Sequence, residues 1–183
     1  SDTKQLDHVL EISKAFELGE VLVTEETLSK REFMDKLKES KVKVVAIKTG
    51  QQLPIFGSSL EVITTQNTDK NDSITMYGKL LNQTFLVTGN IEKKFLTSYY
   101  PRLQADVVIT HQQVSNKKTD IEIFKTVHPK ITVISIDKKK SFKVKNGENN
   151  QEDKELENLV LKTDKKGAIR FKGWTTWNVE TVQ

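Results

Sequence analysis

The stretch Phe85–Ile136, FLVTGNIEKKFLTSYYPRLQADVVITHQQVSNKKTDIEIFKTVHPKITVISI, decides the fold class of this 183-residue chain. It holds two runs dominated by Val and Ile, 105–110 and 131–136, and segments with helical spacing at 91–99 and 120–126. Continuous runs rich in Val and Ile are typical of strands that are buried on both faces, as in parallel sheets. Such strands alternating with helices predict an α/β fold.

The residues on either side of this stretch extend the pattern. Helical spacing is found over 7–18 and over 29–40, where Ser29 is expected to cap the second helix. Before the stretch, the sequence predicts strands at 20–23, 42–48 and 60–64, a polar loop over 66–72, and a hairpin of 74–79 with 83–88. After it, the sequence predicts an antiparallel meander of strands 159–162, 168–171 and 177–182 around a turn at 164–167.

A single domain over 1–183 is the expected organisation, because the chain is long enough for one good core. The run 138–157 is highly charged and contains Asn-Gly and Asn-Asn, so it is predicted to be a mobile loop. A flavodoxin-like sheet is the main alternative architecture, and the consecutive strands between 60 and 88 fit it poorly.

The composition limits the possible chemistry. Hydrophobic residues make up 36% and charged residues 30%, as in a globular domain with a hydrated surface. No run approaches the roughly 18 apolar residues that span a bilayer. The absence of cysteine excludes disulfides, thiolate metal sites and a cysteine nucleophile. The net charge of +4 is a mild basic excess that favours a polyanionic partner.

Several motifs occur in the order of a known family. NDS at Asn71–Ser73 is followed by FLVTGNIE at Phe85–Glu92, ADVVITHQQVS at Ala105–Ser115, and TDKKGAIRF at Thr163–Phe171. In this order the chain resembles the metallo-β-lactamase-like C-terminal domain of the ComEC family of DNA-internalisation proteins. The resemblance implies an α/β metallo-β-lactamase-like αββα sandwich with mixed sheets. It also implies a fragment of a larger membrane protein, with the first strands of the full fold before Ser1.

The family's divalent metal site needs clustered His and carboxylate ligands at strand ends. Asp7 and His8 match two of those ligands, and His111 lies one residue out of register with a third. The other ligand positions are filled by Thr3, Gln5, Asn90, Gln112 and Gln113. The resemblance therefore implies a degenerate metal site, with no confident catalytic residue and no cofactor expected. Zinc or manganese is the expected metal if any activity remains.

The basic side chains suggest a second kind of site. Lys138, Lys139 and Lys140, together with Arg170 and Trp174, are the candidate nucleic-acid contacts, since lysines bind phosphates and tryptophans stack on bases. The alternative for the lysines is a solvated loop, and for Trp174 it is packing within the terminal strands.

The resemblance implies a part in DNA uptake, with a parent protein in the cell membrane and this soluble domain at the extracellular face. Two functions follow as hypotheses: a module without metal-dependent catalysis that guides DNA or has a structural role, or a metal-dependent nuclease acting on the non-transported strand. A scaffold that binds no DNA is a third. The partners implied are DNA, the membrane channel portion of the same polypeptide and other DNA-uptake proteins.

Overall fold

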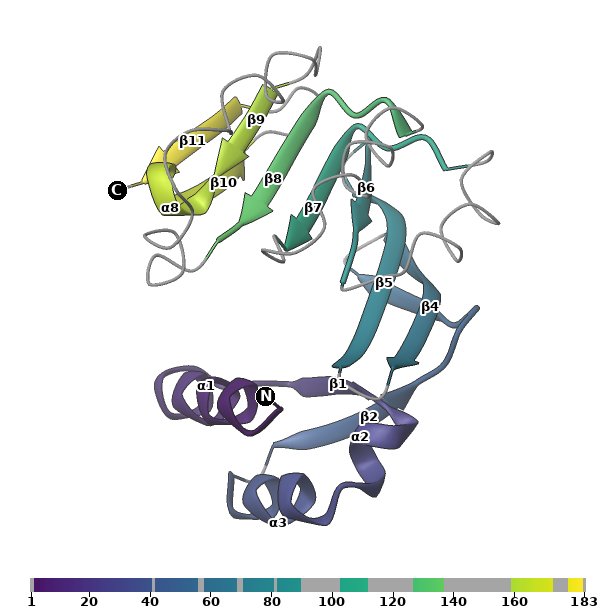
Figure 1. Ribbon diagram of the computed structural model, residues 1–183, viewed down its shortest axis with the longest axis vertical. Helices are drawn as coiled ribbons and strands as arrows, with labels where there is room; N and C mark the ends of the chain where they lie inside the picture. Colours follow the sequence, from purple (N-terminus) through teal and green to yellow (C-terminus); the bar gives the residue numbers. More distant parts are fainter. Residues whose placement is uncertain are drawn as a thin grey trace.

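The computed structural model describes residues 2–40, 42–55, 58–68, 71–80, 82–89, 103–111, 127–136, 159–172 and 178–182. The elements are α1 (Asp2–Ala15), β1 (Glu20–Thr24), α2 (Glu25–Ser29), α3 (Arg31–Ser40), β2 (Lys43–Ile47), β3 (Gln52–Ile55), β4 (Ser58–Thr68), β5 (Asn71–Leu80), β6 (Gln83–Val87), β7 (Val107–His111), β8 (Ile131–Ser135), β9 (Leu159–Lys162), α8 (Thr163–Lys166), β10 (Ala168–Lys172) and β11 (Asn178–Val182). Within these ranges the strands form a seven-stranded sheet and two strand pairs, β1-β2 and β10-β11 (Figure 1).

The seven-stranded sheet has the order β3-β4-β5-β6-β7-β8-β9 and is mixed. Strands β3 to β6 pair antiparallel with their neighbours, whereas β6 to β9 are parallel. In the parallel half Leu86, Val108 and Thr132 stand side by side, and all three are 0% exposed. The prediction that the apolar runs 105–110 and 131–136 form buried parallel strands is confirmed by β7 and β8.

The two faces of the parallel half are covered differently. Leu86 and Val108 belong to one apolar cluster, which Ile63 of β4 also joins. Since successive side chains of a strand point to opposite faces, Phe85 lies on the other face. There its ring meets Phe171 of β10 edge-on, with ring centroids 6.2 Å apart and planes at 85°. The hairpin β10-β11 therefore packs on the sheet as a second layer.

The first 47 residues form a smaller unit around the parallel pair β1-β2, with α1, α2 and α3 beside it (Figure 1). The end of β2 joins this unit to the large sheet, because Ile47 packs with Leu53 of β3 and Val62 of β4. The turn after β2 is fixed to the same strand, since Gly50 N donates to Val62 O over 2.7 Å. Gly50 has φ 81°, a conformation that glycine adopts without steric cost.

The predicted loop over 66–72 is wrong. β4 continues to Thr68 and β5 begins at Asn71, and these two residues are paired across the ribbon. Polar composition indicated a loop, but a ribbon of two antiparallel strands can be solvated and needs no apolar alternation there. The predicted strand 60–64 and hairpin 74–88 are parts of this longer β4-β5-β6 meander.

The helix boundaries also differ from those expected. Helix α1 spans Asp2–Ala15 instead of 7–18, so His8 lies inside the helix. The predicted helix 29–40 is divided at Lys30 into α2 and α3. Ser29 ends α2 instead of capping a helix, and its Oγ donates to Glu26 O over 2.7 Å. The N-cap is Thr24, whose Oγ1 accepts from Thr27 N over 3.2 Å and satisfies an amide that the helix leaves free.

The chain's closing strands are only partly an antiparallel meander. β10 and β11 pair antiparallel as predicted, but β9 pairs parallel with β8, so its predicted direction is wrong. The predicted turn 164–167 is the single helical turn α8, followed by Gly167 with φ 72°. The helices expected over 91–99 and 120–126 and the loop over 138–157 lie outside the described residues. In the described ranges no helix is both long and apolar enough to cross a membrane.

Candidate functional site

The carboxyl ends of β6, β7, β8 and β9 share one edge of the sheet, because these strands are parallel. In open α/β sheets this edge is where ligand sites form. His111 is the last residue of β7 and is in register with Ser135 of β8. Thr88 N donates to Ile109 O over 2.8 Å, which continues the β6–β7 pairing toward Gly89. Asn90, Gln112 and Gln113 lie outside the described residues.

The end of β9 is tied to the same edge. Thr163 Oγ1 accepts from Ile136 N over 2.9 Å and donates to Ile136 O over 3.3 Å. One hydroxyl thus satisfies both backbone groups of the residue that follows β8. This local arrangement places the start of α8, at Thr163, beside the residue that follows β8.

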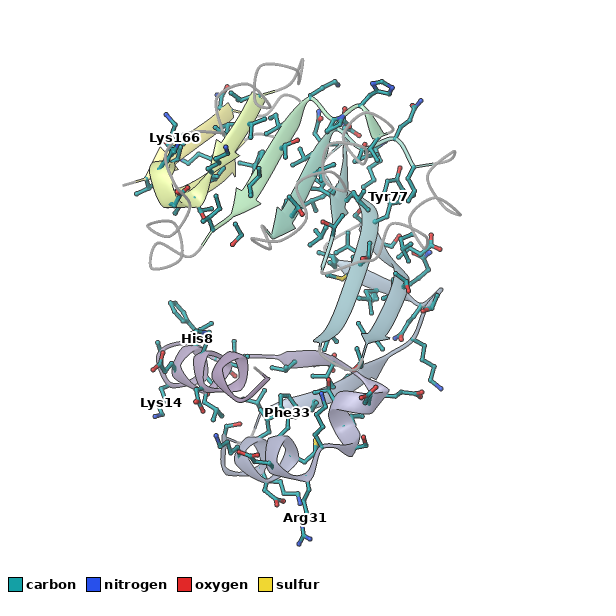
Figure 2. All side chains as sticks on the ribbon, viewed as in Figure 1. His8, Lys14, Arg31, Phe33, Tyr77 and Lys166 are labelled. Atoms are coloured by element: carbon teal, nitrogen blue, oxygen red, sulfur yellow. The ribbon has the colours of Figure 1, made fainter. Side chains whose placement is uncertain are left out.

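Asp7 and His8 diverge on α1. Consecutive helical side chains are separated by about 100° around the axis. Asp7 Oδ1 lies 3.3 Å from Lys36 Nζ on α3, so its carboxylate is held toward that helix. Figure 2 shows His8 projecting from the side of α1 that faces away from α3. The two residues predicted as a shared ligand pair are therefore directed to different places.

The described residues do not fit a dinuclear metal centre. No three His, Cys, Asp or Glu side chains within the described ranges are grouped as a metal site requires. A divalent ion would have to compete with the ammonium of Lys36 for Asp7. Thr3 and Gln5 lie within α1, where their side chains are outside the described part, and the side chain of His111 is outside it as well. No reaction step through a metal is derived.

A polar network that the sequence did not predict lies at the amino ends of the parallel strands. Asp106, just before β7, accepts from Thr84 N over 2.9 Å and from Thr84 Oγ1 over 2.8 Å at Oδ2. Its Oδ1 lies 2.7 Å from Lys130 Nζ, just before β8. Burial raises the pKa of Asp106, but the hydrogen bonds from Lys130 and Thr84 outweigh it, so the pKa is lowered. This network joins the beginnings of β6, β7 and β8.

Tyr77 of β5 lies beside this network. Its hydroxyl donates to Gln104 O over 3.0 Å, which connects β5 to the segment before β7. Burial, together with the negative charge of Asp106, raises the pKa of the Tyr77 hydroxyl. The phenol therefore stays protonated and remains a donor at neutral pH, which suits a structural contact.

A row of buried threonines crosses β4, β5, β6 and β7 near the carboxyl ends of the parallel strands. Thr64 and Thr75 are paired between β4 and β5, and the adjoining registers bring Thr88 and Thr110 into the same row. All four are buried, and Thr75 is 0% exposed. Thr75 Oγ1 has no hydrogen-bond partner among the described residues. Threonine is common in strands, so the sequence does not single out these four residues. Only the strand register shows that they are aligned.

Comparison with solved structures identifies the architecture. The metallo-β-lactamase fold protein YhfI from Bacillus subtilis is similar to this chain with a TM-score of 0.55 and 11% sequence identity, over 87% of this chain and 68% of that one. The fold is that of the metallo-β-lactamases. The predicted α/β metallo-β-lactamase-like class with a large mixed sheet is thereby confirmed.

A second solved structure, the CmlA beta-hydroxylase E377D mutant, is similar with a TM-score of 0.46 and 11% identity, over 63% of this chain and 31% of that one. No protein-family model and no curated protein matches the sequence. The similarity to YhfI thus identifies the fold, and the activity has to be argued from the residues.

The predicted nucleic-acid contacts are divided between described and undescribed parts of this fold. Arg170 is exposed on β10, in register with Glu180 of β11. Lys138, Lys139, Lys140 and Trp174 lie outside the described residues. On β10 the exposed positions alternate with half-buried Ile169 and Phe171, so Arg170 points away from the sheet that Phe171 contacts.

Proposed function

We propose that this chain is a domain of a ComEC-like competence protein and takes part in DNA uptake without metal-dependent catalysis. In this proposal it guides DNA or supports the channel portion of the same polypeptide. The parent protein lies in the cell membrane, and this domain works at the extracellular face together with other DNA-uptake proteins.

The observation that supports the absence of metal-dependent catalysis is the ion pair between Asp7 and Lys36, at an Oδ1–Nζ distance of 3.3 Å. Asp7 is one of the two ligand positions that match the family, and here its carboxylate forms an ion pair between two helices. The bridging carboxylate of the family motif is replaced by Asn90, a neutral and weaker ligand. With a neutral residue at position 90 and Asp7 paired with Lys36, a site for two divalent cations has less negative charge to hold them.

The order of the sequence motifs supports the assignment to DNA uptake, and the metallo-β-lactamase fold is compatible with it. The mild positive net charge of +4 also favours a polyanionic partner. A non-catalytic domain needs only to hold the phosphate backbone, which lysine and arginine side chains do through charge.

A metal-dependent nuclease acting on the non-transported strand is the second candidate. It is favoured by one observation, the position of His111 at the carboxyl end of β7. His8 is exposed and projects away from α3, so it is accessible to a ligand (Figure 2). In that case His8 and His111 would supply imidazole ligands for zinc or manganese, with other ligands drawn from the undescribed residues.

One experiment separates the two candidates. The purified chain is incubated with Zn²⁺ or Mn²⁺, its bound metal is measured after gel filtration, and its cleavage of single- and double-stranded DNA is followed with and without chelator. We expect less than one tenth of an equivalent of metal and no chelator-sensitive cleavage. Stoichiometric metal with cleavage that His8→Ala and His111→Ala abolish would reject the non-catalytic proposal.

A further inference from the structure

Most cations of the smaller N-terminal unit are neutralised by acidic neighbours. Lys36 pairs with Asp7, and Lys38 pairs with Asp35 at 3.2 Å. Lys48, the residue that follows this unit, pairs with Glu25 at 3.0 Å. Lys43 likewise contacts Glu20, and Arg31 lies 3.8 Å from Asp35. A phosphate that approached these side chains would compete with a carboxylate already in place.

The closing segment of the chain is different. Lys165, Lys166 and Arg170 form no ion pair with any residue of the described part, and all three are exposed. They lie within six consecutive positions. Lys172 adds a fourth cation, although its Nζ is held 2.9 Å from Glu180 Oε2. The positive charge here is therefore concentrated, with four cations beside two described carboxylates, Asp164 and Glu180.

These cations lie on two consecutive elements, α8 and β10. Phe171 packs edge-on against Phe85 of the large sheet, so the opposite side of β10 faces outward. Arg170 and Lys172 alternate with the inward residues and project from that outer side, about 7 Å apart along the strand. Lys165 and Lys166 occupy α8, which Gly167 joins to β10, and Figure 2 shows Lys166 pointing outward from this end of the molecule.

We propose that Lys165, Lys166 and Arg170 form a binding surface for the sugar–phosphate backbone of nucleic acid, here called the α8–β10 surface. This inference rests on the proposed function and names the site at which it acts. Two of the three cations are lysines, which act as point charges without bidentate geometry, so the surface binds phosphates without reading base sequence. Such binding suits a strand that must move.

The size of the effect follows from counterion release. Each phosphate neutralised adds about 0.9 to the slope of log affinity against log salt for duplex DNA, and about 0.7 for single strands. Three contacts thus account for a slope of about 2 to 3. Between 50 and 200 mM salt, this is a loss of affinity of roughly 40-fold for duplex and 20-fold for single-stranded DNA.

The test compares two triple variants of the whole chain that carry the same net charge. The first is Lys165→Gln/Lys166→Gln/Arg170→Gln. The matched control is Arg31→Gln/Lys38→Gln/Lys48→Gln, whose side chains are 95%, 72% and 70% exposed and ion-paired. Affinity for a fluorescent random-sequence DNA is measured from 50 to 200 mM salt, with circular dichroism as a check of folding.

We expect the first variant to lose at least tenfold in affinity at 50 mM salt and about 2 to 3 units of slope, and the control to change by less than threefold. A charge-preserving variant, Lys165→Arg/Lys166→Arg/Arg170→Lys, should bind like the parent chain and guards against misfolding. Equal losses in the two neutralised variants, or an unchanged slope, overturn the α8–β10 surface while leaving DNA binding intact. No binding by the parent chain at 50 mM salt, or tighter binding to anionic lipid vesicles than to DNA, overturns both the α8–β10 surface and the DNA-guiding form of the proposed function, and leaves only support of the channel portion.

Discussion

Lys130 Nζ lies 2.7 Å from Asp106 Oδ1, and this ion pair joins the residue before β8 to the residue before β7. The other oxygen of the same carboxylate accepts two hydrogen bonds from Thr84 on β6. The backbone repeats the connection, because Lys130 N and Ile131 N both donate to Asp106 O, over 2.9 and 3.0 Å. One aspartate therefore sets the relative positions of three parallel strands.

Asp106→Asn should destabilise the fold. An amide can accept only at one atom, so one of the contacts to Lys130 or Thr84 is lost and the charge that strengthens them disappears. Hydrogen bonds to a charged group contribute about 1.5–3 kcal/mol, and we expect a loss of about 2 kcal/mol in the free energy of unfolding. Urea unfolding at pH 7 measures it. An Asn variant as stable as the parent chain would show that the network is incidental.

The same carboxylate predicts a pH dependence. The folded-state pKa of Asp106 is lowered, so the unfolded chain binds more protons between the folded pKa and the unfolded value of about 3.9. Its contribution is therefore complete above about pH 4 and is lost as the pH falls through the folded pKa. The stability difference between the parent chain and Asp106→Asn should shrink from pH 7 to pH 3. A difference that stays constant or widens toward acid contradicts this assignment.

Thr75→Val should stabilise the protein. Thr75 is fully buried and its hydroxyl oxygen has no hydrogen-bond partner in the part of the chain that the structure describes, so the fold bears the cost of desolvating it. Valine has nearly the same shape, and its substitution should add about 1 kcal/mol to the free energy of unfolding. The matched control is Thr84→Val, which removes the hydroxyl bonded to Asp106 and should cost about as much. Opposite signs for the two changes are the result to look for.

Features set by neighbouring residues could be predicted from the sequence, whereas features set by residues far apart in the sequence could not. The buried strands β7 and β8 were predicted because a continuous apolar run marks burial on both faces. The direction of β9 was not, because the four residues Leu159–Lys162 contain nothing that distinguishes parallel from antiparallel pairing. The network at Asp106 is not predictable from the sequence, because its partners are 22 residues before it and 24 residues after it. Only the strand register brings them together.

The predicted ligand pair Asp7 and His8 also shows that adjacency in the sequence does not ensure a shared direction in the structure. Asp7 and His8 are neighbours in sequence and match a ligand motif, which made them a natural pair. A helix separates neighbouring side chains around its axis, and the charge of Lys36 on α3 then fixes Asp7. The helical spacing over 7–18 places both residues at a helix start, whereas α1 spans Asp2–Ala15 and holds them in its interior.

Gly78→Ala should be strongly destabilising, because the neighbouring strand β4 approaches Gly78 of β5 closely at its paired residue Leu60. A Cβ atom there would lie 2.9 Å from Leu60 Cα and 2.5 Å from Leu60 Cδ2, and would also meet the Ser59 carbonyl oxygen. Since two of these three are backbone atoms, the strands must separate, at a cost of about 1–3 kcal/mol. Gly19→Ala is the control, since a Cβ at Gly19 meets nothing within 4 Å. Thermal unfolding of both variants tests this, and equal melting temperatures would refute the close approach.

Phe171→Leu should weaken both the packing of the hairpin β10-β11 on the sheet and the binding of DNA. Leucine keeps the inward side of β10 apolar but loses the edge-to-face contact with Phe85, at ring centroids 6.2 Å apart. Aromatic pairs of this kind contribute about 0.5–1.5 kcal/mol beyond the area they bury, so the hairpin β10-β11 should become less firmly held to the sheet. We expect hydrogen exchange in 168–172 and 178–182 to accelerate, and affinity for DNA to fall severalfold with no change in charge. The salt slope should be retained, because Lys165, Lys166 and Arg170 remain. Faster exchange with unaltered DNA affinity would mean that the α8–β10 surface does not depend on this anchor.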